Sequence, residues 1–296
     1  MNELLKAVSR YADANQQGGV AHTPFPGMVI LRETMPTPLL YAITKPLVAL
    51  VVQGKKRVSI GNNTVEFGAG DSLIITADVP TVSQVIGASR SEPYLAFVVE
   101  LDHALIESLV VEMGSAPFDL GETLRVDSTE MEVADAVLRL LRLLDRPTSV
   151  GILKDQLVRE LHYWLLSGRY GGAIRALGIT SSHAQRVGRA IARIRDDFAK
   201  PLRMEQLAEA AGMSLSGFHT HFRMITSLTP LQYQKQLRLI EARSALLAGL
   251  PIAKAAYDVG YESIPQFTRE YGRMFGLSPA KDIREVKTRL STSAQP

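Results

Sequence analysis

Histidine and carboxylate side chains are the groups through which this 296-residue chain, which has no cysteine, could hold a catalytic metal. Of its six histidines only His22 falls in the strand-rich segment, where a metal-binding sheet would carry its ligands. The single His-x-His pair, His219 and His221, falls in a segment predicted to be helical. Positions i and i+2 of a helix point about 200° apart and cannot share a metal. We therefore expect no metal centre, and the missing cysteines exclude disulfides, thiolate catalysis and thiol redox sensing.

Other catalytic motifs are also missing. The segment Gly212-Met-Ser-Leu-Ser-Gly217 does not have the Gly-x-Ser-x-Gly spacing of a hydrolase nucleophile. No glycine-rich loop is followed by Lys-Ser or Lys-Thr, as a phosphate-binding loop would be. The sequence thus favours a protein that is not an enzyme and needs no cofactor.

Recognition of DNA bases is the chemistry that two C-terminal segments could perform. Phe218 and Phe222 lie four residues apart, as do Phe267 and Tyr271, so each pair buries one face of a helix. The opposite faces are left for DNA, with Arg269 suited to a guanine edge and Gln266 to adenine. The residues predicted to contact DNA are Ser216, His219, Thr220, Arg223, Ile264, Pro265, Gln266, Thr268 and Arg269.

The two segments belong to an internal repeat. Gly212 and Gly260 are 48 residues apart, and the Ser, Phe, Phe/Tyr and Thr/Ser-Pro positions that follow them are 49 apart. A glycine ends one helix in a left-handed turn, and Ser214 or Ser263 caps the next. Thr229-Pro230 and Ser278-Pro279 are typical starts of a further helix. The repeat therefore predicts two helix-turn-helix motifs, with helix N-termini that could face phosphates.

A long helix from Pro230 to about Ala248 is expected between the two motifs. About 18 residues at 1.5 Å each give a rigid spacer of about 27 Å. Two recognition helices held by it could enter successive major grooves, about 34 Å apart, on one side of the DNA. The alternative is a plain helical bundle without a ligand.

The distribution of charge favours DNA. Residues 184–296 hold 17 Lys or Arg and 10 Asp or Glu, a net charge of +7, whereas the first 183 residues carry a net −4. A basic domain joined to a mildly acidic one is expected when only one of the two meets phosphates.

The segment from about residue 20 to 100 is predicted to be strands. Runs such as Ala49–Gln53, Arg57–Ile60, Leu73–Thr76 and Tyr94–Val99 recur every 8–12 residues between Gly, Asn and Pro. This spacing indicates a small antiparallel barrel or sandwich. Apolar runs such as Leu47–Val52 are much shorter than the roughly 18 residues of a membrane span. With no secretion signal at the N-terminus, we expect a cytoplasmic protein without membrane contact.

Two amphipathic helices should follow, one with an apolar stripe from Val133 to Leu144 and one from Leu153 to Leu165. They could pack on the barrel, form a dimer interface, or do both. Residues 168–183 contain four glycines and no clear period, so we expect an interdomain linker there.

The chain resembles the AraC/XylS family of bacterial transcription regulators over residues 185–290. The resemblance lies in Gly260-Tyr-Glu-Ser263, Phe275-Gly-Leu-Ser-Pro279 and Leu228-Thr-Pro-Leu-Gln-Tyr233. Residues Leu50–Val58 and Gly70-Asp71 are similar to the cupin-like sensor domain of one subgroup. Thr220 departs from the arginine of many relatives, and Ile264-Pro265 replaces residues that are commonly polar.

The resemblance implies an α+β chain that regulates promoters. Residues 1–167 would form a cupin-like antiparallel β-barrel with a helical dimerisation segment, and residues 184–296 an all-α tandem helix-turn-helix domain. Double-stranded promoter DNA, a second copy of the chain, RNA polymerase and a small-molecule effector are the expected partners. The alternative is a constitutive DNA-binding protein whose barrel is purely structural or dimerising. Polar residues on the predicted strands that could bind an effector are Arg32, Tyr41, Arg57 and Tyr94.

Overall fold

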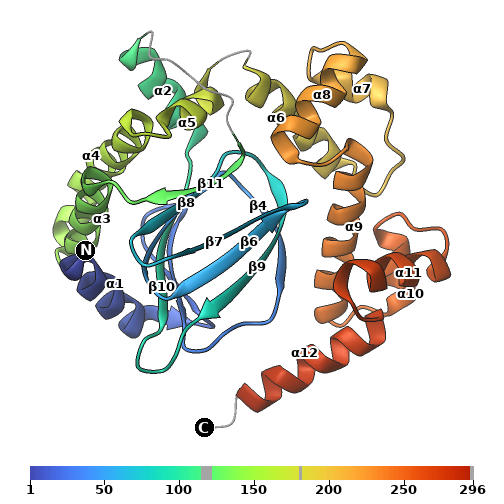
Figure 1. The fold of residues 1–296 in the computed structure, drawn as a ribbon, viewed down its shortest axis with the longest axis horizontal. Coiled ribbons are helices and arrows are strands. Elements are labelled where there is room, and N and C mark those ends of the chain that lie inside the picture. The colour runs from blue at the N-terminus through green and yellow to red at the C-terminus, as the bar shows by residue number, and fades with distance from the viewer. Residues whose placement is uncertain (115–121, 180–181, 294–296) are drawn as a thin grey trace. The chain divides into compact units, whose positions relative to one another are not determined.

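The structure is a computed structural model that describes residues 1–114, 122–179 and 182–293, and the chain divides into two compact units (Figure 1). The sheet unit comprises Met1–Gly188 with Met224–Ser227, and the helical unit comprises Arg189–Arg223 with Leu228–Pro296. All strands of the described residues lie in the sheet unit, so the chain is α+β as expected. None of the helices in the described ranges is long and apolar enough to cross a bilayer.

Two antiparallel sheets form the sheet unit. The seven-stranded sheet has the order β1-β2-β3-β10-β5-β8-β11, and the four-stranded sheet has the order β4-β9-β6-β7. The strands are β1 (Gln16–Gln17), β2 (Val20–His22), β3 (Met28–Glu33), β4 (Leu40–Thr44), β5 (Leu47–Gln53), β6 (Lys55–Ile60), β7 (Asn63–Gly68), β8 (Asp71–Ile75), β9 (Val79–Gly87), β10 (Tyr94–Glu100) and β11 (Leu124–Ser128).

Within the described ranges, the strands form two antiparallel sheets, the sandwich form of the barrel or sandwich expected from the sequence, and not a closed barrel. Among the described strands no hydrogen-bonded ladder joins the four-stranded sheet to the seven-stranded one. Each strand predicted from the sequence is present, because alternating β-branched residues and Gly or Asn turns specify strands locally. Closure depends instead on which strands pair across the ends of the sheets, which a single sequence does not show.

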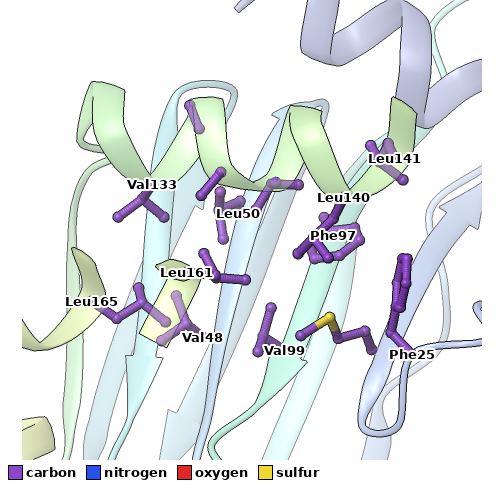
Figure 2. Packing of buried hydrophobic residues seen from close by; sticks show 14 of the residues in the cluster. Phe25, Val48, Leu50, Phe97, Val99, Val133, Leu140, Leu141, Leu161 and Leu165 are labelled. Carbon is purple, nitrogen blue, oxygen red and sulfur yellow. The ribbon is translucent and has the colours of Figure 1, made fainter. Parts of the chain in front are cut away.

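Helices cover one face of the seven-stranded sheet. They are α1 (Asn2–Asn15), α2 (His103–Met113), α3 (Met131–Leu144), α4 (Pro147–Ser167) and α5 (Gly171–Gly178). Figure 2 shows Val133, Leu140 and Leu141 of α3 together with Leu161 and Leu165 of α4 pointing towards strand residues that include Val48, Leu50, Phe97 and Val99. The α3 stripe and the second half of α4 therefore pack on the sheet.

The first half of α4 has an exposed apolar part. Ile152 is 72% exposed and Leu153 is 45% exposed. Packing on the sheet thus accounts for only part of the predicted stripe of this helix, and the dimer interface stays a prediction.

The expected linker at residues 168–183 contains helix α5. Its Ile174 and Leu177 are buried in the core of the sheet unit. A Cβ atom at Gly178 would lie 2.7 Å from Ile106 on α2, so this glycine allows close helix packing. Residues 171–178 therefore belong structurally to the sheet unit, and residues 180–181 of the predicted linker lie outside the described ranges.

The helical unit carries the predicted repeat. Its helices are α6 (His183–Asp196), which begins in the sheet unit, α7 (Met204–Ala210), α8 (Leu215–Thr226), α9 (Pro230–Leu247), α10 (Ile252–Asp258), α11 (Ile264–Phe275) and α12 (Pro279–Ser293). The long helix α9 has the predicted bounds within one residue. Both of its sides are buried: Tyr233 and Leu237 on one, Leu239 and Leu246 on the other. This is expected for a helix packed between two motifs.

Candidate nucleic-acid interface and effector cavity

The two helix-turn-helix motifs close their turns through the same hydrogen bonds. In the first, the Met213 amide donates to the Ala208 carbonyl over 2.9 Å; in the second, the Tyr261 amide donates to the Ala256 carbonyl over 3.0 Å. In both, the glycine between them adopts a positive φ, 60° at Gly212 and 87° at Gly260. This Schellman ending satisfies the last carbonyls of the first helix and sets the direction of the second.

Serine caps start both recognition helices. The Ser214 hydroxyl accepts a hydrogen bond from the Gly217 amide at 3.2 Å, and the Ser263 hydroxyl accepts one from the Gln266 amide at 3.4 Å. The free amides of the first turns lie at the same ends as the predicted DNA contacts, where phosphates bind favourably. Both serines therefore have the capping role predicted from the repeat.

Paired aromatic rings bury one face of each recognition helix within its motif. Phe218 and Phe222 on α8 have ring centroids 5.4 Å apart, and Phe267 and Tyr271 on α11 have centroids 5.5 Å apart. All four side chains are completely buried. Phe222 also meets Tyr233 of α9 edge-on, with centroids 5.7 Å apart. The buried face of each helix is thus the one predicted, which fixes the opposite face outward.

The residues predicted to contact DNA lie on these outward faces. On α8, Ser216, His219, Thr220 and Arg223 are all exposed; on α11, Pro265, Gln266 and Arg269 are exposed, and Ile264 and Thr268 are half-buried. The Thr220 hydroxyl donates to the Ser216 carbonyl one turn earlier, at 3.1 Å. Arg269 is thus exposed, whereas Thr220 already uses its hydroxyl donor within the helix.

Arg273 is an additional basic residue that the sequence reasoning did not single out. It is exposed and follows Arg269 by one turn of α11. No ion pair involving Arg269 or Arg273 is found within the described ranges. The period of four from Arg269 was the available signal, since i and i+4 share a helix face.

The acidic residue of α11 is held away from this face. Glu270 is half-buried, accepts a hydrogen bond of 2.8 Å from the Tyr261 hydroxyl and pairs with Lys235 of α9 at 3.2 Å. Burial works to raise the pKa of Glu270, but hydrogen bonds from Tyr261 and Lys235 and the charge of Lys235 lower it overall. Its charge is therefore neutralised internally, and the outward face of α11 remains basic.

Arg238 joins α9 to two neighbouring loops. Its guanidinium donates to the carbonyls of Phe198, at 2.6 Å, and Ala199, at 2.9 Å, and also to Gly260 at 3.2 Å. Gln234, one turn earlier, donates to the Phe198 carbonyl as well, at 2.8 Å. These bonds tie the loop after α6 and the second turn to the spacer helix, so the second recognition helix has a fixed support.

A buried ionic group attaches α12 to the second motif. Asp282 is 5% exposed and accepts hydrogen bonds from Arg243 of α9 at 2.7 and 3.1 Å and from the Tyr271 hydroxyl at 2.7 Å. Burial and the adjacent Asp282 raise the pKa of Tyr271, so its hydroxyl remains a donor. The guanidinium of Arg243 also lies 5.3 Å from the centre of the Phe275 ring.

A cavity of about 90 Å³ lies between the two sheets of the sheet unit. Its walls are mostly apolar. The seven-stranded sheet contributes Leu31, Leu47, Ala49, Leu73, Ile75, Tyr94 and Val98, and β4, β6, β7 and β9 contribute Thr44, Lys56, Val58, Phe67, Thr81 and Ser83. A concave apolar site with a few polar groups has the character of a small-molecule site.

Tyr94 is the one residue of the four predicted effector ligands that lines this cavity. Arg32 instead forms an ion pair of 3.0 Å with Asp13 of α1, and Arg57 donates to Glu66 on β7 at 2.8 Å. Tyr41 is half-buried on β4 and is not part of the cavity wall. Alternation explains both arginines, because each follows a cavity-lining residue, Leu31 or Lys56, and so points to the opposite face.

Lys56 is the cavity residue that the sequence reasoning missed. It shares a face of β6 with the buried Val58 and Ile60. Burial lowers the pKa of Lys56, and the nearby charge of Glu33 partly offsets this. The two-residue period from Val58 was the available signal.

Two capped, basic helix-turn-helix motifs on one spacer helix, together with a double-sheet domain enclosing a cavity, define a two-domain transcription regulator. Comparison with known families agrees: residues 24–173 match the model described as AraC-type transcriptional regulator N-terminus, and residues 207–285 match a helix-turn-helix domain model. The chain belongs to the AraC/XylS family of transcription regulators.

Curated relatives match about a third of the chain. A probable thc operon regulatory protein of Rhodococcus erythropolis is 30% identical over 94 residues, 30% of this chain and 28% of the relative. The transcriptional activator RhaS of Salmonella paratyphi B is 33% identical over 109 residues, 36% of this chain and 38% of its own length. The chain thus spans 28% and 38% of the length of these two relatives.

Solved structures of ToxT from Vibrio cholerae share the fold. One has a TM-score of 0.55 at 10% identity and covers 86% of this chain and 97% of ToxT. Another, described as unsaturated fatty acid bound, has a TM-score of 0.56 at 10% identity, with 87% and 93% coverage. At this identity the similarity concerns the fold.

Proposed function

We propose that the chain binds promoter DNA sequence-specifically, with α8 and α11 inserted into successive major grooves. The observation that carries this proposal is that α9 packs against both motifs while each recognition helix has its aromatic face buried and its polar face exposed. The spacer of 18 residues spans about 27 Å, compatible with grooves about 34 Å apart. A regulator built this way acts at promoters, where RNA polymerase is its partner, and carries out no catalysis itself.

Footprinting tests the two-groove arrangement directly. The full chain, on a site selected from random DNA, should protect two adjacent major grooves on one side of the duplex per protomer. Arg223→Ala should weaken protection in one groove and Arg269→Ala in the other. Protection of a single groove by each protomer contradicts the proposal.

Pairing of two copies on repeated half-sites is the second part of the proposal. The exposed Ile152 and Leu153 at the start of α4 support an interface in the sheet unit, since exposed apolar neighbours on one helix favour association. Analytical ultracentrifugation should show a dimer that Ile152→Glu dissociates. A monomer at all concentrations would exclude it.

Effector control through the cavity of the sheet unit is the third part. The cavity lies in the sheet unit, whereas the residues predicted to contact DNA all lie in the helical unit, as expected for a sensor domain beside a DNA-binding domain. Fatty acid binding by ToxT provides a precedent on a similar fold. The competing function is a constitutive DNA-binding protein. Operator affinity of the full chain, measured with and without cavity ligands, separates the two: a sensor changes affinity, and a constitutive binder keeps it constant.

A further inference from the structure

Two polar groups project into the cavity from opposite sheets. Lys56 comes from β6 of the four-stranded sheet and Tyr94 from β10 of the seven-stranded sheet. The Lys56 ammonium lies 5.9 Å from the centre of the Tyr94 ring. The two side chains are therefore neighbours on facing walls of one cavity.

Neither group has a partner that satisfies it. Tyr94 is 1% exposed, and its hydroxyl has no hydrogen-bond partner among the described residues. Within the same part of the chain, no carboxylate lies within the 4 Å of an ion pair with Lys56. Within these ranges Tyr94 is thus a buried donor without an acceptor, and Lys56 is a half-buried cation without an ion-pair partner. Both arrangements cost free energy. A ligand that accepts hydrogen bonds and carries a negative charge would satisfy both.

Glu33 is the acidic group whose charge acts on the pKa of Lys56. Its backbone pairs with Tyr94 across β3 and β10, and its charge acts on Lys56 without forming an ion pair. Burial raises the pKa of Glu33, and the charge of Lys56 opposes this. Glu33, the last residue of β3, thus compensates the charge of Lys56 only partly.

The remaining wall determines the rest of the ligand. Eight of the lining residues are aliphatic or aromatic side chains without polar atoms: Leu31, Leu47, Ala49, Val58, Phe67, Leu73, Ile75 and Val98. The hydroxyls of Thr44 and Thr81 are already bonded to each other at 2.7 Å. The volume of about 90 Å³ is several times the 10–15 Å³ that one water needs. A small molecule with one anionic end and an apolar body fits these walls.

We propose that the effector is a small monocarboxylic acid whose carboxylate pairs with the Lys56 ammonium and accepts a hydrogen bond from the Tyr94 hydroxyl. Its apolar body then lies against the aliphatic wall between the sheets. The inference rests on the proposed effector control for its biological role, but binding of the acid can be measured without any reference to DNA.

Calorimetry on the full chain tests the chemical class. The probes are straight-chain and branched monocarboxylates of four to eight carbons, together with phenylacetate, and each acid is compared with its primary amide. At least one acid should bind saturably and at least about tenfold more tightly than its amide, the value of one charge-assisted contact. If no acid binds, or if amides bind equally well, the proposal is overturned.

Variants identify the groups responsible. Lys56→Met should weaken acid binding about ten- to hundredfold, and Tyr94→Phe about three- to tenfold. Lys55→Met is the matched control, because Lys55 is the exposed neighbour on the same strand and should leave acid affinity unchanged.

Thermal unfolding of the variants distinguishes a loss of acid binding from a folding defect. Without acid, Lys56→Met should be at least as stable as the wild type, because it removes a half-buried charge that Glu33 compensates only partly. A clear loss of stability would instead show that Lys56 serves as a structural partner of Glu33 and would contradict the proposal. Operator binding measured in parallel keeps the two claims separate. If the acid binds without changing DNA affinity, effector control is refuted but the acid site is not. If a neutral ligand controls DNA binding instead, the proposed acid is refuted but effector control is not.

Discussion

Gly260 lies directly against the carbonyl of Ala199: a Cβ atom at position 260 would sit 2.0 Å from that oxygen. The contact joins the turn of the second helix-turn-helix motif to the loop after α6, and Arg238 donates hydrogen bonds to both partners. The glycine therefore has two roles, a left-handed turn with φ of 87° and a surface without a side chain for the adjacent loop.

Gly260→Ala should destabilise the helical unit by about 2–5 kcal/mol, since strain at positive φ adds to the clash with Ala199. Gly249→Ala is the matched control: its φ is 101°, and nothing lies within 4 Å of its added Cβ. The control should lose only about 1–2 kcal/mol. Urea unfolding of the full chain, followed by hydrogen exchange in α10 and α11, measures both; equal losses would disprove the role of the close contact.

Asp282→Asn should also weaken the helical unit, because it leaves the guanidinium of Arg243 without its carboxylate. The side chains of Arg243 and Asp282 are only 15% and 8% exposed. Breaking such a buried pair costs about 3–5 kcal/mol. Asp258→Asn, which breaks the exposed pair with Lys254, should cost below about 0.5 kcal/mol. The same denaturation measurement checks both, and similar losses would show that the buried pair does not stabilise the fold.

The helix-turn-helix repeat was predictable because its determinants are local. Gly260, the cap Ser263 and the buried pair Phe267 and Tyr271 all act within one turn and one helix, and the structure places each as predicted. The repeat of the same pattern 48–49 residues earlier strengthened the inference. The support from Arg238 was not predictable, since it joins segments distant in the sequence.

The strands of the sheet unit were predictable from the sequence, but the residues that line its cavity were less so. Lys56 and Arg57 are adjacent and both basic, and only the phase of the strand decides which one faces inward. The buried Val58 and Ile60 set that phase. The glycines of residues 168–178 suggested a linker, yet Gly178 provides room for Ile106 of α2. A glycine-rich segment indicates flexibility or close packing, and tertiary contacts decide between them.

Acidification below about pH 6.5 should destabilise the sheet unit through His162. This side chain is 2% exposed; its Nε2 accepts a hydrogen bond from the Asp102 amide at 3.3 Å, and its Nδ1 lies 2.8 Å from the Val158 carbonyl. Burial lowers the pKa of His162, although the Val158 hydrogen bond and the charge of Asp102 oppose this. The folded state therefore binds a proton less readily than the unfolded state.

The folded state therefore loses stability as the pH falls. Above the unfolded pKa of about 6.5 both states are neutral, and stability is unaffected. As the pH falls from there through the lowered folded pKa, the unfolded state takes up the proton first, and stability is lost by up to about 1.4 kcal/mol per pH unit. His162→Gln should flatten this slope between pH 7 and 5 in urea unfolding. His22→Gln, at an exposed site, should keep the wild-type slope; an unchanged slope in His162→Gln would remove His162 as the cause.

Arg269→Ala should weaken operator binding by about 1–3 kcal/mol and relax the preference at one base position, as expected for a bidentate contact to guanine. Arg273→Ala, one turn later on the same exposed face of α11, should weaken binding to operator and random DNA alike and reduce the salt dependence by about one phosphate contact. Affinities of the full chain for both kinds of DNA, measured over a range of salt concentrations, distinguish the two roles. If Arg269→Ala loses the same affinity on random DNA as on the operator, its guanidinium binds a phosphate, and base recognition by α11 must come from Gln266 or its neighbours.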